Sequence, residues 1–145
     1  MLRLAAMARP IGITADEIDL SSRFLETHAV AGSPAGASET TIASLTVASN
    51  VVVTKGIFLE AWCAVTVGTN GVSLQVKIHH TDSSGATIAD TGAITAVATD
   101  LYTLSAQGID AVPVLPGQIY IVTLTVASGS ATSTVSAVSL FATIV

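Results

Sequence analysis

The sequence predicts an all-β protein: an antiparallel β-sandwich, a single jelly roll of about eight strands, preceded by an extended N-terminal arm. Val, Ile and Thr make up 48 of the 145 residues, and such β-branched side chains favour strands over helices. From Thr40 onward apolar and polar residues alternate with a period of two. Turn-forming residues interrupt the alternation roughly every 8–12 residues, as in sandwiches and barrels. An immunoglobulin-like sandwich is the structural alternative, but its usual Cys…Trp…Cys spacing is missing.

Residues 1–39 are predicted to form an arm and linker, and residues 40–145 the jelly-roll domain. The first part carries eight of the fifteen charged residues and a Gly/Ser/Pro/Ala-rich stretch at 31–38. Thr14 followed by Glu17 matches a capping box, which predicts a short helix over 15–27. An extended arm through Ile11 and Ile13 is the alternative interpretation.

The first strands of the domain are predicted at 40–47, 57–67 and 72–79, where apolar side chains recur at every second position. Asn70-Gly71 separates the second and third of these segments. An Asn-Gly pair between two alternating runs is the strongest short signal for a β-hairpin, so a tight hairpin is expected there.

The second half of the domain is predicted to add shorter strands around Ile88 and Ile94. Three longer strands are expected at 101–106, 118–127 and 132–145. Turns are expected where Gly, Pro, Asp and Ser cluster, namely at Asp82-Ser83-Ser84-Gly85, Pro116-Gly117 and Ser128-Gly129-Ser130.

Charge and composition exclude several classes of function. The net charge is −5 with five Lys and Arg, whereas a nucleic-acid groove needs clustered basic residues. A lone cysteine, Cys63, excludes a disulfide framework and is expected to be a buried, inert thiol. Residues 111–145 are uncharged, but Pro and Gly break them and Ser and Thr alternate through them, so no membrane-spanning helix is expected. Synthesis in the cytoplasm is the default expectation.

Residues with catalytic or metal-binding chemistry are few. His79 and His80 are adjacent on a predicted strand and would point to opposite faces, so we expect neither a metal site nor another cofactor. The carboxylates recur at intervals that match turns, where Asp bonds the local backbone: Asp82, Asp90, Asp100 and Asp110. No nucleophile elbow or phosphate loop is present, and we expect no enzymatic activity; a cupin-type jelly-roll enzyme is the least favoured alternative.

Three aromatic residues on three predicted strands form a candidate aromatic interface: Trp62, Tyr102 and Tyr120. They would stack on a sugar, lie in the core, or lie in a subunit contact, and the last two are favoured. The domain also lacks charge where a monomer would expose its polar face to water. Since interface cores are depleted of charge, we expect subunits to cover one another; a monomer coated with hydroxyl groups is the alternative.

An arm, a Gly/Pro/Ser/Ala linker and a jelly roll rich in Val, Thr, Ala and Ser resemble the capsid decoration (cement) proteins of tailed phages and other small jelly-roll virion proteins. Two stretches, Thr54-Lys55-Gly56-Ile57-Phe58-Leu59-Glu60-Ala61 and Leu115-Pro116-Gly117-Gln118-Ile119-Tyr120, also resemble tumour-necrosis-factor-like heads of phage fibres. The resemblance implies a homotrimer on the capsid exterior, made in the host cytoplasm, that contacts the major capsid protein and extends its arm over neighbouring subunits.

The predicted function is therefore that of a non-enzymatic virion protein that stabilises a capsid by binding across subunit junctions. The candidate contact residues of the arm are Arg3, Arg9, Ile11, Ile13, Ile18, Phe24 and Leu25. The alternative is a receptor- or glycan-binding jelly-roll head of a phage fibre. Neither function involves nucleic acid or a membrane.

Overall fold

The computed structural model of the chain describes residues 23–28, 38–51, 53, 55–81, 84–111, 114–127 and 133–145. These residues form strands joined by turns and irregular segments, and none of them is helical. No helix able to cross a membrane therefore occurs in this part of the chain. The strands are β1 (Arg23–His28), β2 (Thr40–Thr46), β3 (Ile57–Thr66), β4 (Val72–His80), β5 (Thr87–Asp90), β6 (Ile94–Ala96), β7 (Leu101–Asp110), β8 (Ile119–Ala127) and β9 (Thr134–Ile144).

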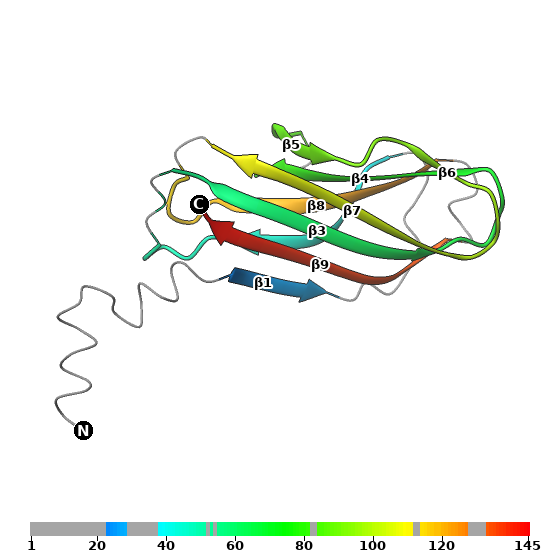
Figure 1. Cartoon of the computed structure of the whole chain (residues 1–145), viewed down its shortest axis with the longest axis horizontal. Coiled ribbons are helices and arrows are strands. Elements are labelled where there is room, and N and C mark those ends of the chain that lie inside the picture. The colour runs from blue at the N-terminus through cyan, green and yellow to red at the C-terminus, as the bar shows by residue number, and fades with distance from the viewer. Residues whose placement is uncertain are drawn as a thin grey trace, which may run out of the picture.

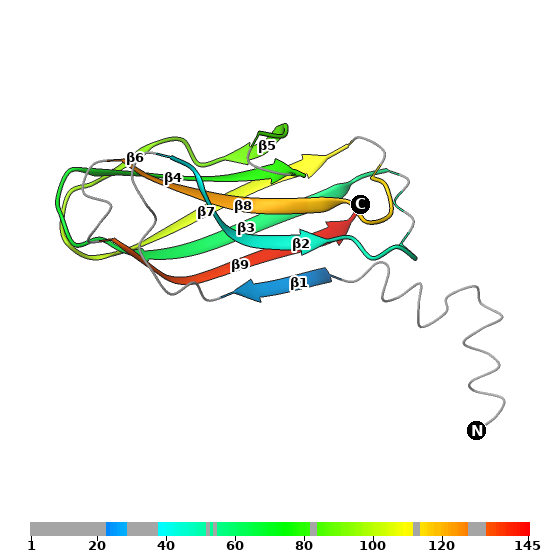
Figure 2. The same ribbon diagram turned by 180° about the vertical axis from the view of Figure 1, so that it is seen from behind.

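The strands form two antiparallel sheets that face each other (Figures 1 and 2). Sheet A has the order β1-β9-β3-β7, and sheet B has the order β2-β8-β4-β5, with β6 also paired to β4. The chain passes from one sheet to the other between β1 and β2, β2 and β3, and β3 and β4, and it alternates again from β7 to β9. This is the predicted jelly roll.

The core lies between the sheets and is made by every second residue of their strands. In β3 the inward side chains are fully buried from Ile57 to Val65, and in β4 the same holds from Val72 to Ile78. The outward neighbours in β3 include Trp62, which is 37 % exposed. The period of two in the sequence therefore separates core from surface as predicted.

Strand β1 occupies residues for which a helix was predicted. Residues 23–28 pair with β9 from Arg23↔Thr143 to His28↔Val138, so the helix expected over 15–27 is wrong for its last five residues. Residues 15–22 lie outside the described residues. The sandwich thus includes a strand from the segment that we assigned to the arm, and sheet A has four strands because of it.

The Asn70-Gly71 turn is present, but the hairpin expected from it is wrong. Gly71 has φ +77°, the left-handed conformation that favours glycine. The strands on either side do not pair, because β3 bonds to β7 and β9 in sheet A while β4 lies in sheet B. The turn therefore connects the two layers. By contrast, the expected turn at Pro116-Gly117 forms locally, with the Gln118 amide donating to the Leu115 carbonyl over 3.0 Å.

Strand β7 continues four residues beyond its predicted end at 106. Its final part passes close to β5 at Gly108. A Cβ atom there would lie 2.5 Å from the backbone oxygen of Ile88, closer than real contacts allow. Only glycine lets the two strands approach this closely.

Candidate functional site

The outer face of strands β3, β7 and β9 in sheet A carries little charge. Among the residues of β3, β7 and β9 only Glu60 and Asp110 are charged, and Asp110 is buried. The face exposes hydroxyl groups, amides and apolar side chains instead. At its centre, two sets of paired residues run across β7, β3 and β9. One set is Gln107, Glu60 and Phe141, and the neighbouring set is Ser105, Trp62 and Ser139.

A pocket of about 360 Å³ lies at this centre, between β3 and β9. Glu60, Trp62, Ser139 and Phe141 line it. Because Trp62 is opposite Ser139 and Glu60 is opposite Phe141, the two aromatic rings occupy one diagonal and the two polar groups the other.

The carboxylate of Glu60 is held in place by a neighbour on β7. The Gln107 side-chain amide donates to Glu60 Oε1 over 2.7 Å. Within the part of the chain that the structure describes, no bond to the second carboxylate oxygen is seen. The pocket therefore offers a fixed acceptor, a serine hydroxyl and a half-exposed indole ring.

A second feature is a group of exposed apolar side chains at one end of the sandwich, which we call the apolar end: Ile109, Leu115, Ile119 and Val145. Strand ends gather there, since Ile57 pairs with both Asp110 and Ile144, and the Val145 amide donates to the Gly56 carbonyl. Figure 2 shows the start of β8 and the C-terminus at this end. Exposed fractions range from 38 % for Ile119 to 65 % for Leu115. Lys55 also lies at this end and is exposed.

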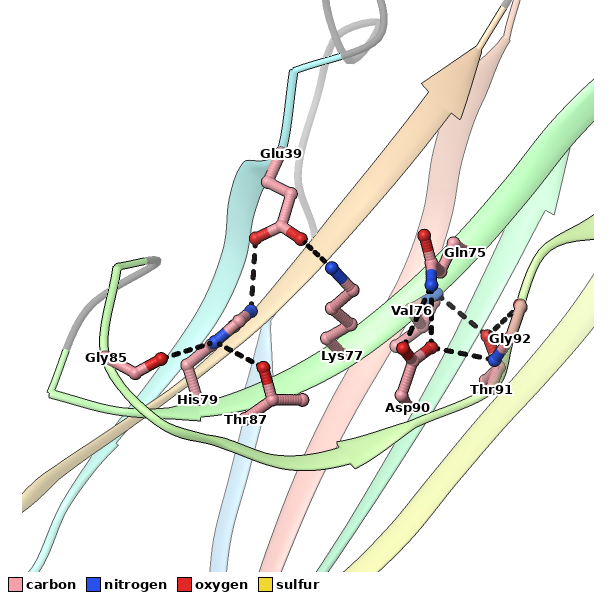
Figure 3. A network of polar contacts seen from close by, with 10 residues as sticks. All are labelled: Glu39, Gln75, Val76, Lys77, His79, Gly85, Thr87, Asp90, Thr91 and Gly92. Atoms are coloured by element: carbon pink, nitrogen blue, oxygen red, sulfur yellow. Dashed lines mark hydrogen bonds and ion pairs between the residues drawn. The ribbon is translucent and has the colours of Figure 1, made fainter.

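A polar network covers the outer face of sheet B (Figure 3). Glu39, which directly precedes β2, bonds to the Lys77 ammonium and lies 3.1 Å from Nε2 of His79. The other ring nitrogen of His79 faces the Gly85 carbonyl at 3.2 Å. The bond from Glu39 is the largest cause that raises the pKa of Lys77. Glu39 thereby ties the entry of β2 to β4.

The same face carries Asp90 at the end of β5. Its carboxylate accepts two bonds from the Gln75 side-chain amide, at 2.9 and 3.0 Å, and one from the Gly92 backbone amide at 2.7 Å. Partial desolvation opposes ionisation of Asp90, but these donors and the nearby Lys77 outweigh it and hold its pKa below the usual value. Asp90 is thus a turn former, as predicted.

Asp110 departs from the turn-former prediction. Its buried carboxylate accepts a hydrogen bond from the Tyr120 hydroxyl over 2.7 Å, and His80 Nε2 lies 3.7 Å away. The group joins β4, β7 and β8 at the edge of the core. Desolvation and then the bond to Asp110 raise the pKa of Tyr120. The turn-former prediction agrees with the structure at Asp100, whose carboxylate accepts a hydrogen bond from the Leu101 amide. Asp82 lies outside the described residues.

The two adjacent histidines point to opposite faces of sheet B, as expected. His79 belongs to the outer network, whereas His80 packs edge-on against the ring of Tyr120. In the described part of the chain, no three His, Cys, Asp or Glu residues gather as a metal site requires.

The candidate aromatic interface is not brought together. Tyr120 is fully buried, which agrees with the alternative of a core position and excludes Tyr120 from an aromatic interface: its ring fills the core and its hydroxyl donates to Asp110. Tyr102 packs against the core and bonds to the backbone of Ala98. Trp62 alone is exposed on the outer face of sheet A. Cys63 is fully buried as predicted, and burial raises its pKa to about 12.

Most candidate residues of the arm lie outside the described residues: Arg3, Arg9, Ile11, Ile13 and Ile18. Phe24 and Leu25 belong to β1, where they are in register with Ala142 and Phe141. The grouping of Glu60, Gln107 and Phe141 was not predicted from the sequence. Alternation places each on an outward position, but only the register between β3, β7 and β9 brings them together.

The sequence matches no protein-family model and no curated protein. Solved structures with a similar fold include infectious bursal disease virus, Gx strain, with a TM-score of 0.60 and 14 % identity over 85 % of this chain and 32 % of that chain. The VP2 subviral particle of the same virus gives a TM-score of 0.53 and 15 % identity over 85 % and 32 %. The chain thus spans about a third of the length of these viral chains. At this identity the likeness shows a shared jelly-roll fold.

Proposed function

We propose that this chain is a structural virion protein that binds a viral capsid as a decoration subunit and stabilises it. In this proposal it acts as a homotrimer on the capsid exterior, contacts the major capsid protein and catalyses no reaction. The host cytoplasm is its site of synthesis. The observation that carries the proposal is the apolar end, where four large hydrophobic side chains are exposed together.

Such a group has a physical use in an assembly. Burial of apolar surface stabilises a contact by about 25 cal/mol per Å², and charge is depleted at the centre of contact surfaces. Apart from Lys55, the exposed side chains described at this end are uncharged. A subunit or capsid contact would remove Leu115 and Ile119 from water, and Lys55 would need a carboxylate partner across that contact.

The position of β1 also supports the apolar end as the contact surface. Arg23 pairs with Thr143, two residues before the C-terminus, so the segment that precedes β1 joins the sandwich at the apolar end. In this proposal the candidate arm residues that precede β1 extend the contact made by Ile109 and Leu115. Because the contact would engage the assembled capsid and not its unfolded subunits, it would stabilise the capsid by mass action.

The experiment compares native mass by light scattering over a dilution series. The test variant replaces Ile109 and Leu115 at the apolar end by Thr and Ser. The matched control makes the same kind of change at the opposite end, with Leu101→Thr and Val97→Ser, which are also exposed. Circular dichroism checks that both variants are folded.

We expect the wild type and the control to have the mass of three subunits and the test variant to dissociate at least tenfold more readily. A wild type that is monomeric at every concentration would overturn the proposal. Equal dissociation of the two variants would overturn the assignment of the contact to the apolar end. A deletion of residues 1–22, which leaves β1 intact, separates the arm from the sandwich as the source of the contact.

A further inference from the structure

The pocket on the outer face of sheet A presents groups that both donate and accept hydrogen bonds. Glu60 supplies carboxylate acceptors, and Ser139 supplies a hydroxyl that does both. Gln107, held against Glu60 at 2.7 Å, adds a side-chain carbonyl beside the pocket. Such a mixture suits a ligand whose own polar groups donate and accept, which is the chemistry of a sugar hydroxyl.

The rings supply the complementary apolar contact. Trp62 is 37 % exposed and Phe141 is half-buried, and both face the pocket. One face of a pyranose ring carries mainly C–H groups, which pack on an indole ring. The volume of about 360 Å³ falls within the size range of small-molecule sites.

The charge of the pocket lining argues against the other ligand classes. The residues that line the pocket include no Lys or Arg, so a phosphate or carboxylate ligand would meet Glu60 with no cation in the lining to compensate. A quaternary ammonium cation would use the rings and Glu60, but its ammonium group makes no hydrogen bond with the hydroxyl of Ser139.

We propose that this pocket binds a neutral saccharide, with one pyranose ring stacked on Trp62 and its hydroxyls bonded to Glu60 and Ser139. The site lies on the side of the sandwich and the apolar end at its tip, so the assignment is independent of the proposed capsid role. One protein would carry both surfaces.

Trp62 is the only tryptophan of the chain, so its fluorescence reports on the pocket directly. The experiment titrates the full chain with glucose, galactose, mannose, rhamnose, fucose, N-acetylglucosamine and N-acetylgalactosamine. Choline is titrated in parallel as the probe for an organic cation. The variants are Glu60→Gln and Ser139→Ala, and the control is Thr103→Ala, which lies on the same face outside the pocket.

We expect at least one sugar to give a saturable change with a Kd of about 1 mM, the weak affinity of an open pocket. Glu60→Gln should weaken the binding about tenfold, because a hydrogen bond to a charged carboxylate is replaced by a weaker one to a neutral amide. Thr103→Ala should leave it unchanged. No saturable change with any sugar, a change unaffected by both pocket variants, or saturation by choline alone would overturn the assignment. Each of these results can occur with the trimer intact, which separates failure here from failure of the capsid role.

Discussion

Replacing Tyr120 by Phe removes one hydroxyl from the core, and with it the hydrogen bond that this hydroxyl donates to the buried Asp110. The bond is 2.7 Å long, and both residues are at least 94 % buried. Loss of a hydrogen bond to a charged group lowers the free energy of unfolding by about 1.5–3 kcal/mol. At about 4 °C per kcal/mol for a chain of this length, Tm should fall by about 6–12 °C.

Urea unfolding, monitored by Trp62 fluorescence at fixed protein concentration, measures the change. The control is Tyr102→Phe, which deletes the same atom from a half-exposed residue bonded to the Ala98 backbone, and it should cost less than half as much. If Tyr120→Phe lowers the free energy of unfolding by less than about 0.5 kcal/mol, the reasoning is refuted, because the other contacts of Asp110 would then be enough to stabilise its buried carboxylate.

The pH dependence of stability provides a second check on Tyr120. Its pKa is raised in the folded protein, by desolvation first and by the bond to Asp110 second. The folded state therefore keeps a proton that the unfolded state releases above about pH 10. This part of the stability is fully present below about pH 10 and is lost as the pH rises further. Tyr120→Phe should remove this alkaline loss, and a wild-type slope retained in the variant would contradict the assignment.

Three further predictions concern other parts of the fold. At about pH 8, Cys63 should react with a thiol reagent at least a hundredfold more slowly in the folded than in the urea-unfolded protein, because the thiol is buried and its pKa is raised to about 12. Rapid stoichiometric labelling of the folded protein would contradict this prediction. Glu39→Gln should lower the free energy of unfolding by about 0.5–1 kcal/mol and reduce its salt dependence, since the ion pair with Lys77 is partly exposed. Lys55→Gln is the control, and equal effects of the two variants would argue against the network of Glu39, Lys77 and His79. Gly108→Ala should lower the free energy of unfolding by about 1–3 kcal/mol and speed amide hydrogen exchange in β5, because the new Cβ would meet the Ile88 backbone. Ser105→Ala on the same strand should have neither effect. Unchanged exchange in Gly108→Ala would show that β5 adjusts without cost.

Local sequence pattern predicts the strands of this protein well where one face is strictly apolar. In β3 and β4 the alternation is unbroken, so strand type and inner face follow from period alone. In β8 the alternation does not distinguish the inner face from the outer face, because Ile121 and Thr123 on the outer side are as buried as the inner residues. The pattern therefore left two positions open for Tyr120, the core and a subunit contact, and the structure places its ring in the core.

Features set by contacts between distant segments were not predicted. Residues 23–28 mix charged and apolar side chains without strict alternation, and their conformation depends on pairing with β9 more than a hundred residues later. The Asn70-Gly71 pair specifies a turn but not the partners of the flanking strands, which are chosen by the sheet order. The pocket has the same origin, since Glu60 meets Gln107 and Phe141 only through the register of three strands.

The pairing of Arg23 with Thr143 has a practical consequence for how the protein is labelled. In a chain that lacks residues 1–22, a purification tag joined directly to Arg23 and a fluorophore attached at Val145 would both emerge beside Leu115 and Ile119, where they would shield the apolar side chains from a partner. The Asn70-Gly71 turn lies at the other end of β3, and a side chain at Gly71 would meet no neighbouring atom within 4 Å. Immobilisation through an insertion at that turn would present the apolar end outward from a sensor surface.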